Sequence, residues 1–368
     1  MTKLVNICDV CSEIFAGGDA PKNNMSVEKT DKYNIPIYSN GEAKDGLYGF
    51  TNFARVSEPS ITISARGTIG YTSVRNTPFV PIVRLITLVP KRDIIDIRYL
   101  FYAAQNYKFD GSGTSIPQLT VPVLKKYNFP LPTLEEQKRI VVVLDKICDL
   151  IRFRKQQLSK LDELVKSRFI EMFGNCKNTA RLGDCCEVHA RIGWQALTRD
   201  EHMKTGEYML VTGTDFKDGE INYSTCVYVA KERYEMDKHI ILKNDDVLIT
   251  KDGTIGKVAI VHNLTKPATL NAGVFVVRPD ERFNKEYISN VFKGPLFSDY
   301  VEVSKTGATI KHLNQKHLVE FLIPVPSLAE QEKFAKFTQK TDKSKLAVQQ
   351  SLKKLETLKK ALMQQYFG

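Results

Sequence analysis

Hydrophobic and polar positions along the chain follow two different periods, which alternate. Before residue 130, segments such as YNIPIYSNG, PSITISARGTIG and FVPIVRLITLVP are rich in β-branched and aromatic residues and are broken by Gly, Asn and Asp. Between residues 176 and 324 the same is true of GEYMLVTGTDFKDGEINYSTCVYV, DDVLITKDGTIGKVAIV and AGVFVVRP. This pattern predicts twisted β-sheet with long loops. Short helices are expected at 97–105 and 285–292.

Two long segments have instead the period of an α-helix. TLEE at 133–136 and SLAE at 327–330 are capping boxes that follow a proline, so each predicts a helix start. The first helix then runs without Gly or Pro to Phe173. Its apolar residues follow one another at alternating spacings of four and three residues, if Arg154 and Arg168 are accepted at two positions of the apolar seam. The seam positions predicted in the two helices are Ile140, Leu144, Ile147, Ile151, Leu158, Leu161, Val165, Met172, Val348, Leu352, Leu355, Leu362 and Tyr366.

The apolar stripe is long and narrow. About 41 residues at 1.5 Å per residue give a rod of roughly 60 Å, and about two positions in seven are apolar, as the seam between two helices requires. The β-rich part alone cannot bury so long a stripe, so we expect the two helices to pack on each other. If a twofold axis relates them, they pack antiparallel. Two surface helices that each lie along their own domain are the alternative.

The two periods alternate because the chain contains an internal repeat. ISARGTIG at 63–70 recurs as ITKDGTIG at 249–256, an offset of 186. GTSIPQL at 113–119 recurs as GATIKHL at 307–313, an offset of 194, and PLPTLEEQ at 130–137 recurs as PVPSLAEQ at the same offset. The second copy therefore carries a net insertion of eight residues between its turn and its glycine loop.

The repeat predicts an α+β protein with an internal pseudo-twofold. We expect two β-rich domains separated by two long helices that form an antiparallel coiled coil, and a chain of 368 residues suits two domains of ordinary size. The predicted segments are a β-rich domain at 1–130, a long helix at 131–174, a second β-rich domain at 175–324 and a second long helix at 325–368.

Composition narrows the class of protein. No run of eighteen apolar residues could span a bilayer, and the first fifteen residues lack an apolar stretch followed by a small-residue cleavage site, so a cytoplasmic location is expected. Seven cysteines at scattered spacings favour reduced thiols over a disulfide framework. Cys8 and Cys11 have the spacing of a zinc ligand pair, but the adjacent Cys185 and Cys186 cannot easily complete a tetrahedral site. No metal site is predicted.

The net charge of +11 indicates an anionic partner, with nucleic acid favoured over a membrane because the chain carries no lipid-anchoring signal. Residues 1–174 hold 24 basic against 18 acidic residues, and residues 175–368 hold 29 against 24. Because both halves share the excess and no long basic tail carries it, the sequence favours two folded basic surfaces.

Motifs that carry catalysis are absent from the sequence. It contains no G-x-x-x-x-G-K-[ST], no G-x-G-x-x-G after a strand and no H-E-x-x-H. It also lacks a Pro-Pro-aromatic tetrapeptide of the kind that amino-methyltransferases use to hold a flipped base. All six histidines lie in the second copy, so the two copies cannot share histidine chemistry. No catalytic residue is predicted.

Residues suited to contact DNA lie in the repeated turn. Arg66 and Thr68 in the first copy, and Lys251 and Thr254 in the second, lie beside a glycine whose backbone N–H groups are exposed, which suits a phosphate. A hairpin turn repeated only for its backbone conformation is an equally good explanation.

The glycine loops carry further candidates. Gln, Asn and Lys supply donors and acceptors that read base edges, while Ser and Thr hydroxyls suit phosphates. The loop candidates are Ser112, Thr114, Gln118, Lys305, Thr309, Lys311, Asn314 and Gln315. Ser112, Pro117 and Gln118 are replaced by Thr306, Lys311 and His312 in the second copy. Two domains with one framework and different loop residues would read different DNA sequences.

Together these features resemble the specificity subunit of type I DNA restriction–modification enzymes. The resemblance rests on PSITISARGTIG and DDVLITKDGTIGKVAIV, the glycine loop before each helix, the P-[LV]-P-[TS]-L-x-E-Q helix start, and the order of domains and helices over the whole chain. It implies two target-recognition domains that each read one half of an asymmetric, bipartite site in double-stranded DNA. It also implies that the coiled coil docks two methyltransferase subunits.

The resemblance further implies that this chain is not catalytic and binds no cofactor. S-adenosylmethionine would belong to the methyltransferase subunits, and ATP and Mg²⁺ to restriction and translocase subunits that join through the methyltransferase core. Related subunits also serve systems in which methylase and nuclease are fused, so that alternative is open. A two-headed scaffold that binds proteins, and an enzyme with an unrecognised site, are the alternatives from other classes.

Overall fold

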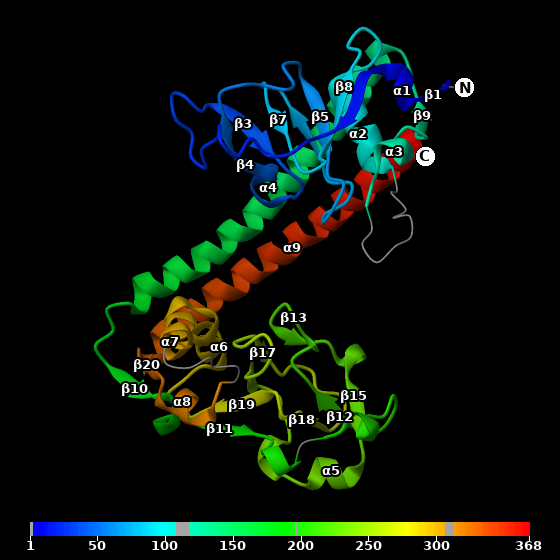
Figure 1. Cartoon of the computed structure of the whole chain (residues 1–368). Helices are drawn as coiled ribbons and strands as arrows, with labels where there is room; N and C mark the ends of the chain where they lie inside the picture. Colours follow the sequence, from blue (N-terminus) through cyan, green and yellow to red (C-terminus); the bar gives the residue numbers. More distant parts are fainter. Residues whose placement is uncertain (1–2, 108–117, 196, 306–312) are drawn as a thin grey trace. The chain divides into compact units, whose positions relative to one another are not determined.

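The structure, a computed structural model, divides into two compact units that each contain one β-rich domain and part of both long helices (Figure 1). The described residues are 3–107, 118–195, 197–305 and 313–368. The N-terminal unit is Met1–Gln156 with Gln349–Gly368, and the second unit is Gln157–Val348. This division differs from the four predicted segments, because the long helices supply apolar residues to the cores of both units.

In the N-terminal unit the strands are β1 (Leu4–Asn6), β2 (Cys11–Ala16), β3 (Ile35–Tyr38), β4 (Leu47–Thr51), β5 (Ser60–Ile63), β6 (Thr72–Arg75), β7 (Val80–Pro81), β8 (Ile86–Pro90) and β9 (Asn128–Pro130). The short helices are α1 (Ile7–Val10), α2 (Ile97–Asn106) and α3 (Val121–Leu124). One antiparallel sheet has the order β2-β8-β5-β6. A second has the order β4-β3-β7, with β3 and β7 parallel, and β1 pairs with β9.

In the second unit the strands are β10 (Thr179–Arg181), β11 (Cys186–Ala190), β12 (Tyr208–Val211), β13 (Phe216–Lys217), β14 (Glu220–Ile221), β15 (Val227–Val229), β16 (Val247–Thr250), β17 (Val258–Ile260), β18 (Ala268–Leu270), β19 (Val274–Pro279) and β20 (Leu322–Pro324). The short helices are α5 (Lys231–Glu235), α6 (Lys285–Lys293), α7 (Pro295–Lys305) and α8 (Gln315–Glu320). The sheets have the orders β11-β19-β16-β17-β14-β13 and β15-β12-β18, and β10 pairs with β20.

The two units repeat the same strand pairings. β11-β19-β16-β17 corresponds to β2-β8-β5-β6, the parallel pair β12 and β18 corresponds to β3 and β7, and α6 corresponds to α2. The repeat extends to single contacts, since the hydroxyls of Tyr99 and Tyr287 donate to the carbonyls of Pro130 and Pro324 at 2.8 and 3.0 Å. The helices expected at 97–105 and 285–292 are α2 and α6. The predicted α+β fold class with its internal repeat is confirmed.

The eight-residue insertion lies mostly after α6. Helix α6 starts 188 residues after α2 starts, whereas Leu313 lies 194 residues after Leu119. Six of the eight residues therefore follow α6, in the region where the second unit has α7.

Strand β16 shows why some strands of these sheets are continuous runs of apolar residues in the sequence. Its side chains alternate between two cores, as successive residues of a strand must. Val247 and Ile249 belong to a core shared with α6, whereas Leu248 belongs to one shared with β12. All three are fully buried. A strand covered on both faces cannot show the alternating hydrophobic pattern of a half-exposed one.

The long helices are α4 (Leu134–Phe173) and α9 (Leu328–Phe367). At the start of α9 the capping box is complete, because Ser327 N–H donates to Glu330 Oε2 at 3.0 Å and Glu330 N–H donates to Ser327 Oγ at 3.4 Å. At the start of α4, Glu136 N–H donates to Thr133 Oγ1 at 3.4 Å. Both helices therefore start where the sequence predicts.

A buried glutamine ties each long helix to its domain. Gln137 Oε1 accepts from Asp96 N–H at 2.8 Å, and its Nε2 donates to the carbonyls of Ile94 and Pro132. Gln331 makes the same three contacts in the second unit. Both side chains are completely buried. The Gln of the repeated P-[LV]-P-[TS]-L-x-E-Q motif thus joins the helix start to the turn before α2 or α6.

In each unit the two long helices run antiparallel. In the N-terminal unit Leu144, near the start of α4, shares the core with Phe367 at the end of α9, and Lys155 pairs with Glu356 at 3.8 Å. A later position on α4 therefore contacts an earlier position on α9, which confirms the predicted direction of packing.

The second unit shows the same direction. Phe169, near the end of α4, packs edge-on against Phe334, near the start of α9, at 5.6 Å between ring centroids. Earlier on α4, Asp162 pairs with Lys345 at 2.7 Å. Every predicted seam residue is buried or half-buried. The seam also contains residues that the prediction omitted, namely Val141, Phe169, Phe334, Met363 and Phe367.

None of the helices in the described ranges combines the length and apolar character that crossing a membrane requires.

Candidate nucleic-acid interface

The repeated turn has the same backbone conformation in both units. Gly67 and Gly70 have φ of 70° and 85°, and Gly253 and Gly256 have φ of 66° and 84°. These values lie in the left-handed region that glycine adopts without steric cost. Gly70 N–H donates to Ser64 O and Gly256 N–H donates to Thr250 O, at 2.9 and 3.0 Å. The backbone therefore requires both glycines of the motif, whatever the turn binds.

The end of each glycine loop is attached to the turn. Leu119 N–H donates to Ala65 O, and Leu313 N–H donates to Lys251 O, both at 2.9 Å. Residues more than fifty positions apart in the sequence thus lie side by side. In each unit the described end of the glycine loop therefore lies beside the turn.

In the N-terminal unit the structure brings Arg66 and Gln118 together. Arg66 Nε and Nη2 donate to Gln118 Oε1 at 3.1 and 2.8 Å. Arg66 and Thr68 are exposed, and Gln118 is half-buried. Gln118 therefore orients the Arg66 guanidinium at the exposed edge of the turn. In the sequence these two residues belong to separate motifs, the glycine loop and the turn.

In the second unit the equivalent turn carries different side chains. Lys251 is half-buried, and its Nζ lies 5.2 Å from the centroid of the Phe275 ring. Thr254 and Asn314 are exposed, and Asn314 precedes α8 without making a side-chain cap. Gln315 Nε2 donates to Val188 O at 2.7 Å, so that amide nitrogen already has a partner within the fold.

Several candidates fall outside what the structure describes. Ser112, Thr114, Thr309 and Lys311 lie outside the described residues. Lys305 is the last residue of α7, but its side chain also lies outside that description.

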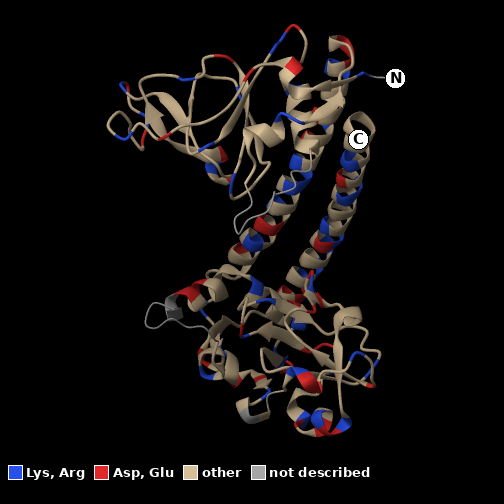
Figure 2. Cartoon of the chain, turned by 45° about the vertical axis from the view of Figure 1, so that its right-hand side comes forward, with Lys and Arg blue, Asp and Glu red and all other residues tan. Residues whose placement is uncertain are grey.

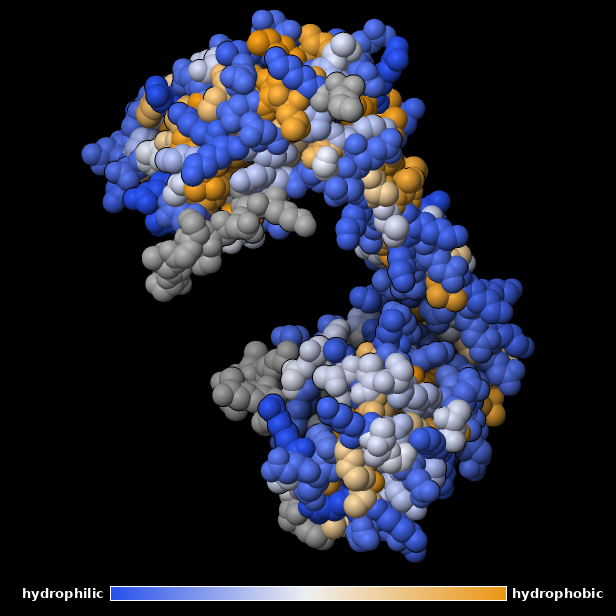
Figure 3. Space-filling model, turned by 90° about the vertical axis from the view of Figure 1, so that its right-hand side faces the viewer, coloured by the Kyte–Doolittle hydropathy of each residue, from blue (hydrophilic) through white to orange (hydrophobic). Residues whose placement is uncertain are grey.

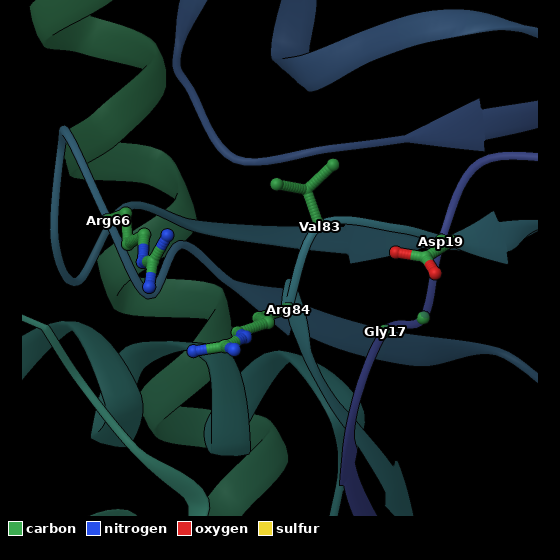
Figure 4. Close-up of a pocket in the computed structure, with 6 residues that line it drawn as sticks. Gly17, Asp19, Arg66, Val83 and Arg84 are labelled. Carbon is green, nitrogen blue, oxygen red and sulfur yellow. The ribbon is translucent and has the colours of Figure 1, made fainter.

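A cavity lies beside the turn in each unit. The cavity in the N-terminal unit has a volume of about 300 Å³ and is lined by Gly17, Gly18, Asp19, Arg66, Val83 and Arg84 (Figure 4). The cavity in the second unit has a volume of about 490 Å³, and its lining includes Arg191, Ile192, Lys251, Asp252, Asn314 and Gln315. The sequence did not point to Arg84 or Arg191, because neither lies in a repeated motif.

The backbone beside the first cavity adopts an unusual conformation. Val83 and Arg84 have φ of 52° and 61°, values that are costly for side chains larger than glycine and rare for β-branched ones. Their N–H groups donate to Gly18 O and Gly17 O at 2.7 and 3.0 Å. A Cβ at Gly17 would lie 2.6 Å from the Pro81 carbonyl. Close backbone approach therefore holds Arg84 at the cavity.

The cysteines in the described part of the chain are free thiols. Cys8 is exposed, whereas burial raises the pKa of the Cys11 thiol to about 12. No group of three or more His, Cys, Asp or Glu residues in the described ranges is arranged to hold a metal ion.

The arrangement of two repeated units recurs in a known family. The family model for the type I restriction modification DNA specificity domain matches residues 2–163 and again residues 177–359. The chain belongs to this family. Each match covers one β-rich domain and most of the long helix that follows it.

Relatives resemble the chain in part or in full. A Mycoplasma pneumoniae protein provisionally named type I specificity subunit S.MpnORF89P is 38% identical over 143 residues, which are 39% of this chain and 42% of that protein. The chain thus spans less than half the length of this relative. The type I restriction enzyme EcoBI specificity subunit of Escherichia coli is 21% identical over 345 residues, or 83% of this chain and 70% of that protein.

Two solved structures share the fold. A chain from a study of complex assembly and conformational transition of the type I R-M system has a TM-score of 0.61 at 17% identity, covering 99% of this chain and 97% of that one. The type I restriction-modification S subunit from M. genitalium has a TM-score of 0.55 at 16% identity, covering 100% and 96%.

Proposed function

We propose that this chain is the DNA-specificity subunit of a type I restriction–modification complex and that each unit reads one half of an asymmetric, bipartite site in double-stranded DNA. One observation carries the proposal. The turn has the same backbone conformation in both units, and the same backbone hydrogen bond ties Leu119 or Leu313 to it, while the side chains of the turn differ. Arg66 in one unit corresponds to Asp252 in the other.

This difference has a direct chemical meaning. An arginine offers only donors, which suit the O6 and N7 acceptors of guanine, whereas a carboxylate offers only acceptors, which suit the amino group of cytosine. Gln118 fixes the orientation of the Arg66 guanidinium, as specific recognition requires. Two turns with one backbone conformation and different hydrogen-bonding side chains would prefer different half-sites.

The charge of the chain supplies the part of the affinity that does not depend on sequence. Lys and Arg residues occur in both units and along both long helices (Figure 2). The excess of basic over acidic residues in each half of the sequence attracts a polyanion, and the resulting affinity falls steeply as salt concentration rises.

The long helices would dock two methyltransferase subunits. The face of the molecule in Figure 3 is mainly hydrophilic, with hydrophobic residues among the hydrophilic ones. On α4, Val142, Val143, Leu150 and Phe153 are exposed and share a helix face away from the seam. Exposed apolar side chains on one face are typical of protein–protein contacts.

In this proposal the chain works in the cytoplasm and neither catalyses a reaction nor binds a cofactor. S-adenosylmethionine would be bound by the methyltransferase subunits. ATP and Mg²⁺ would be bound by restriction and translocase subunits, which join through the methyltransferase core.

The proposal is tested by comparing DNA methylation in cells with and without this chain. Loss of one bipartite methylation motif is expected, and an unchanged methylome would refute the proposal. Gln118→Ala should then alter base preference in one half-site, by about 1–3 kcal/mol at the affected base pair. Gln156→Ala, at an exposed position of α4, is the matched control and should leave the motif unchanged.

A protein-binding scaffold is the rival function from another class. Binding of the full chain to random duplex DNA at two salt concentrations separates the two. A specificity subunit should bind more weakly at the higher salt, whereas a scaffold should show no salt-dependent retention.

A further inference from the structure

The two cavities lie at equivalent places on the repeated sheets. Ile86 pairs with Ile63 in the N-terminal unit, and Phe275 pairs with Ile249 in the second. Since Ile63 and Ile249 are equivalent in the repeat, so are Ile86 and Phe275. Each cavity is therefore bordered by the turn, by the segment before β8 or β19, and by the end of β2 or β11.

Both cavities carry two basic side chains, but these come from different positions. In the N-terminal unit they are Arg66 and Arg84, and in the second unit they are Arg191 and Lys251. When the two units are aligned by their strand registers, the equivalent positions are Gly17 and Arg191, Ala65 and Lys251, Arg66 and Asp252, and Arg84 and Gly273. The positive charge was thus kept in place while every residue that supplies it changed. Side chains kept only for packing would not show this pattern.

Arg191 is the most informative of the four. Its side chain is only 1% exposed. Nε donates to Leu270 O at 2.8 Å, and Nη2 donates to Thr269 Oγ1 and Arg233 O at 3.2 and 3.4 Å. Nη1 is buried and has no hydrogen-bond partner. Every acceptor is neutral, and Arg191 makes no ion pair within the ranges that the structure describes.

A buried charge without a counterion is costly, and proteins usually pair it. The carboxylates of Asp237 and Glu201 favour the charged form of Arg191, but Glu201 is already paired with Arg233. Burial and the Arg233 guanidinium together lower the pKa of Arg191. An anion in the adjoining cavity would supply the missing negative charge.

Lys251 and Asp252 complete the charge on the second cavity. Lys251 also makes no ion pair among the described residues, so the lining has two cations against one carboxylate. The cavity volume of about 490 Å³ is many times the roughly 30 Å³ of one water molecule. The site therefore has both the room and the charge for a polyatomic anion.

The lining of the first cavity has the same balance of charge, because it contains the two cations Arg66 and Arg84 and the one carboxylate Asp19. In Figure 4 the two guanidinium groups face the same space, and Asp19 lies on the other side of the Val83 backbone. Gln118 contacts Nε and Nη2 of Arg66, and no hydrogen bond from Nη1 to a described residue is present. That nitrogen is available to an anion.

We propose that each cavity binds one phosphate-type anion, and that in the DNA complex this anion is a phosphodiester of the DNA backbone. The second statement rests on the proposed function, whereas the first does not. Arg84, Arg191 and Lys251 would fix the position of each unit on the duplex without reading its sequence, whereas Arg66 borders both the first cavity and the surface that reads bases.

The test uses the full chain with Lys251→Gln and Arg84→Gln, which each remove one charge from one cavity. Lys333→Gln, at an exposed position of α9, removes the same charge outside both cavities and serves as the control. Thermal midpoints are measured in inorganic phosphate and in chloride of equal ionic strength. Phosphate should raise the midpoint of the wild type and the control, and the rise should be smaller in both cavity variants.

DNA affinity is then measured at several salt concentrations for random and for target duplexes. Each cavity variant should lower the slope of log K against log salt by about 0.9 and weaken binding about fivefold at 0.15 M salt. The weakening should be equal for all sequences, with base preference unchanged.

The outcomes separate the alternatives. A lower slope without phosphate stabilisation assigns the cavities to the DNA backbone alone, and phosphate stabilisation with an unchanged slope assigns them to a free phosphate. Cavity variants that match the wild type in both measurements, or that change base preference, overturn the proposal. A wild type that binds no DNA yet is stabilised by phosphate through Lys251 and Arg84 refutes the proposed function and leaves the anion sites standing.

Discussion

Replacing Gln331 with alanine should destabilise the second unit more than any exposed substitution on α9. Gln331 is completely buried and makes three hydrogen bonds. It accepts from Asn284 N–H and donates to the carbonyls of Arg282 and Pro326, at 2.8, 2.9 and 3.0 Å. Alanine leaves these backbone groups without their partners at the junction between α6 and α9.

The expected size follows from these contacts. A lost hydrogen bond costs about 1 kcal/mol where the remaining group can reach water, and about 1–3 kcal/mol where that group is left buried and unsatisfied. Because these backbone groups are only partly buried, we expect a total near 3 kcal/mol. For a unit of this size that corresponds to a fall in Tm of about 6–12 °C.

The chain offers two internal comparisons. Gln137→Ala removes the equivalent three contacts in the N-terminal unit and should have an effect of similar size there. Gln339→Ala, at an exposed position of α9, should change stability by less than about 0.5 kcal/mol. Hydrogen exchange read out by peptide shows which unit is destabilised, and urea unfolding gives the free energy.

The variant Gln331→Glu adds a dependence on pH. A carboxylate there can still accept from Asn284 N–H, but it would face two carbonyl oxygens in a buried site, which raises its pKa in the folded state. Since the folded state then binds the proton more tightly than the unfolded state, the stability deficit relative to the wild type should shrink as pH falls. Wild-type stability in Gln331→Ala, or a deficit in Gln331→Glu that grows on acidification, would refute this reasoning.

Two further predictions concern the core and the thiols. Leu144→Ala should lower stability by about 2–5 kcal/mol in urea unfolding because Leu144 is fully buried, whereas Leu150→Ala, at an exposed position of the same helix, should cost under about 0.5 kcal/mol; equal effects would contradict the assignment of the seam. Cys11 should react slowly with iodoacetamide at pH 8, because burial raises its pKa to about 12, while the exposed Cys8 reacts readily; mass spectrometry of the labelled peptides distinguishes them, and rapid labelling of folded Cys11 would contradict its burial.

Local chemistry explains what could be predicted from the sequence. The capping boxes at Thr133 and Ser327 and the spacing of apolar residues after them constrain the backbone nearby, so the long helices and their seam were predictable. The glycines of the repeated turn were predictable because Gly67 and Gly253 must adopt positive φ. A repeated motif also predicts a repeated domain, and the matching strand orders confirm that prediction.

The contacts that the sequence did not predict depend on packing between segments that are far apart in the chain. Gln118 contacts Arg66 only because Leu119 is hydrogen-bonded to Ala65, fifty-four positions earlier. Arg84 lies at a cavity because of an unusual backbone conformation, and nothing in the neighbouring sequence signals it.

The sequence by itself therefore determined the repeat, the helices, the turn and the shared positive charge of the two halves. The tertiary structure alone decided which charged side chains meet at each cavity. Arg191 and Lys251 lie sixty positions apart, and strand pairing brings them to one cavity. Periodicity and turn chemistry describe interactions among neighbouring residues, whereas the environment of a charged group depends on every segment that packs around it.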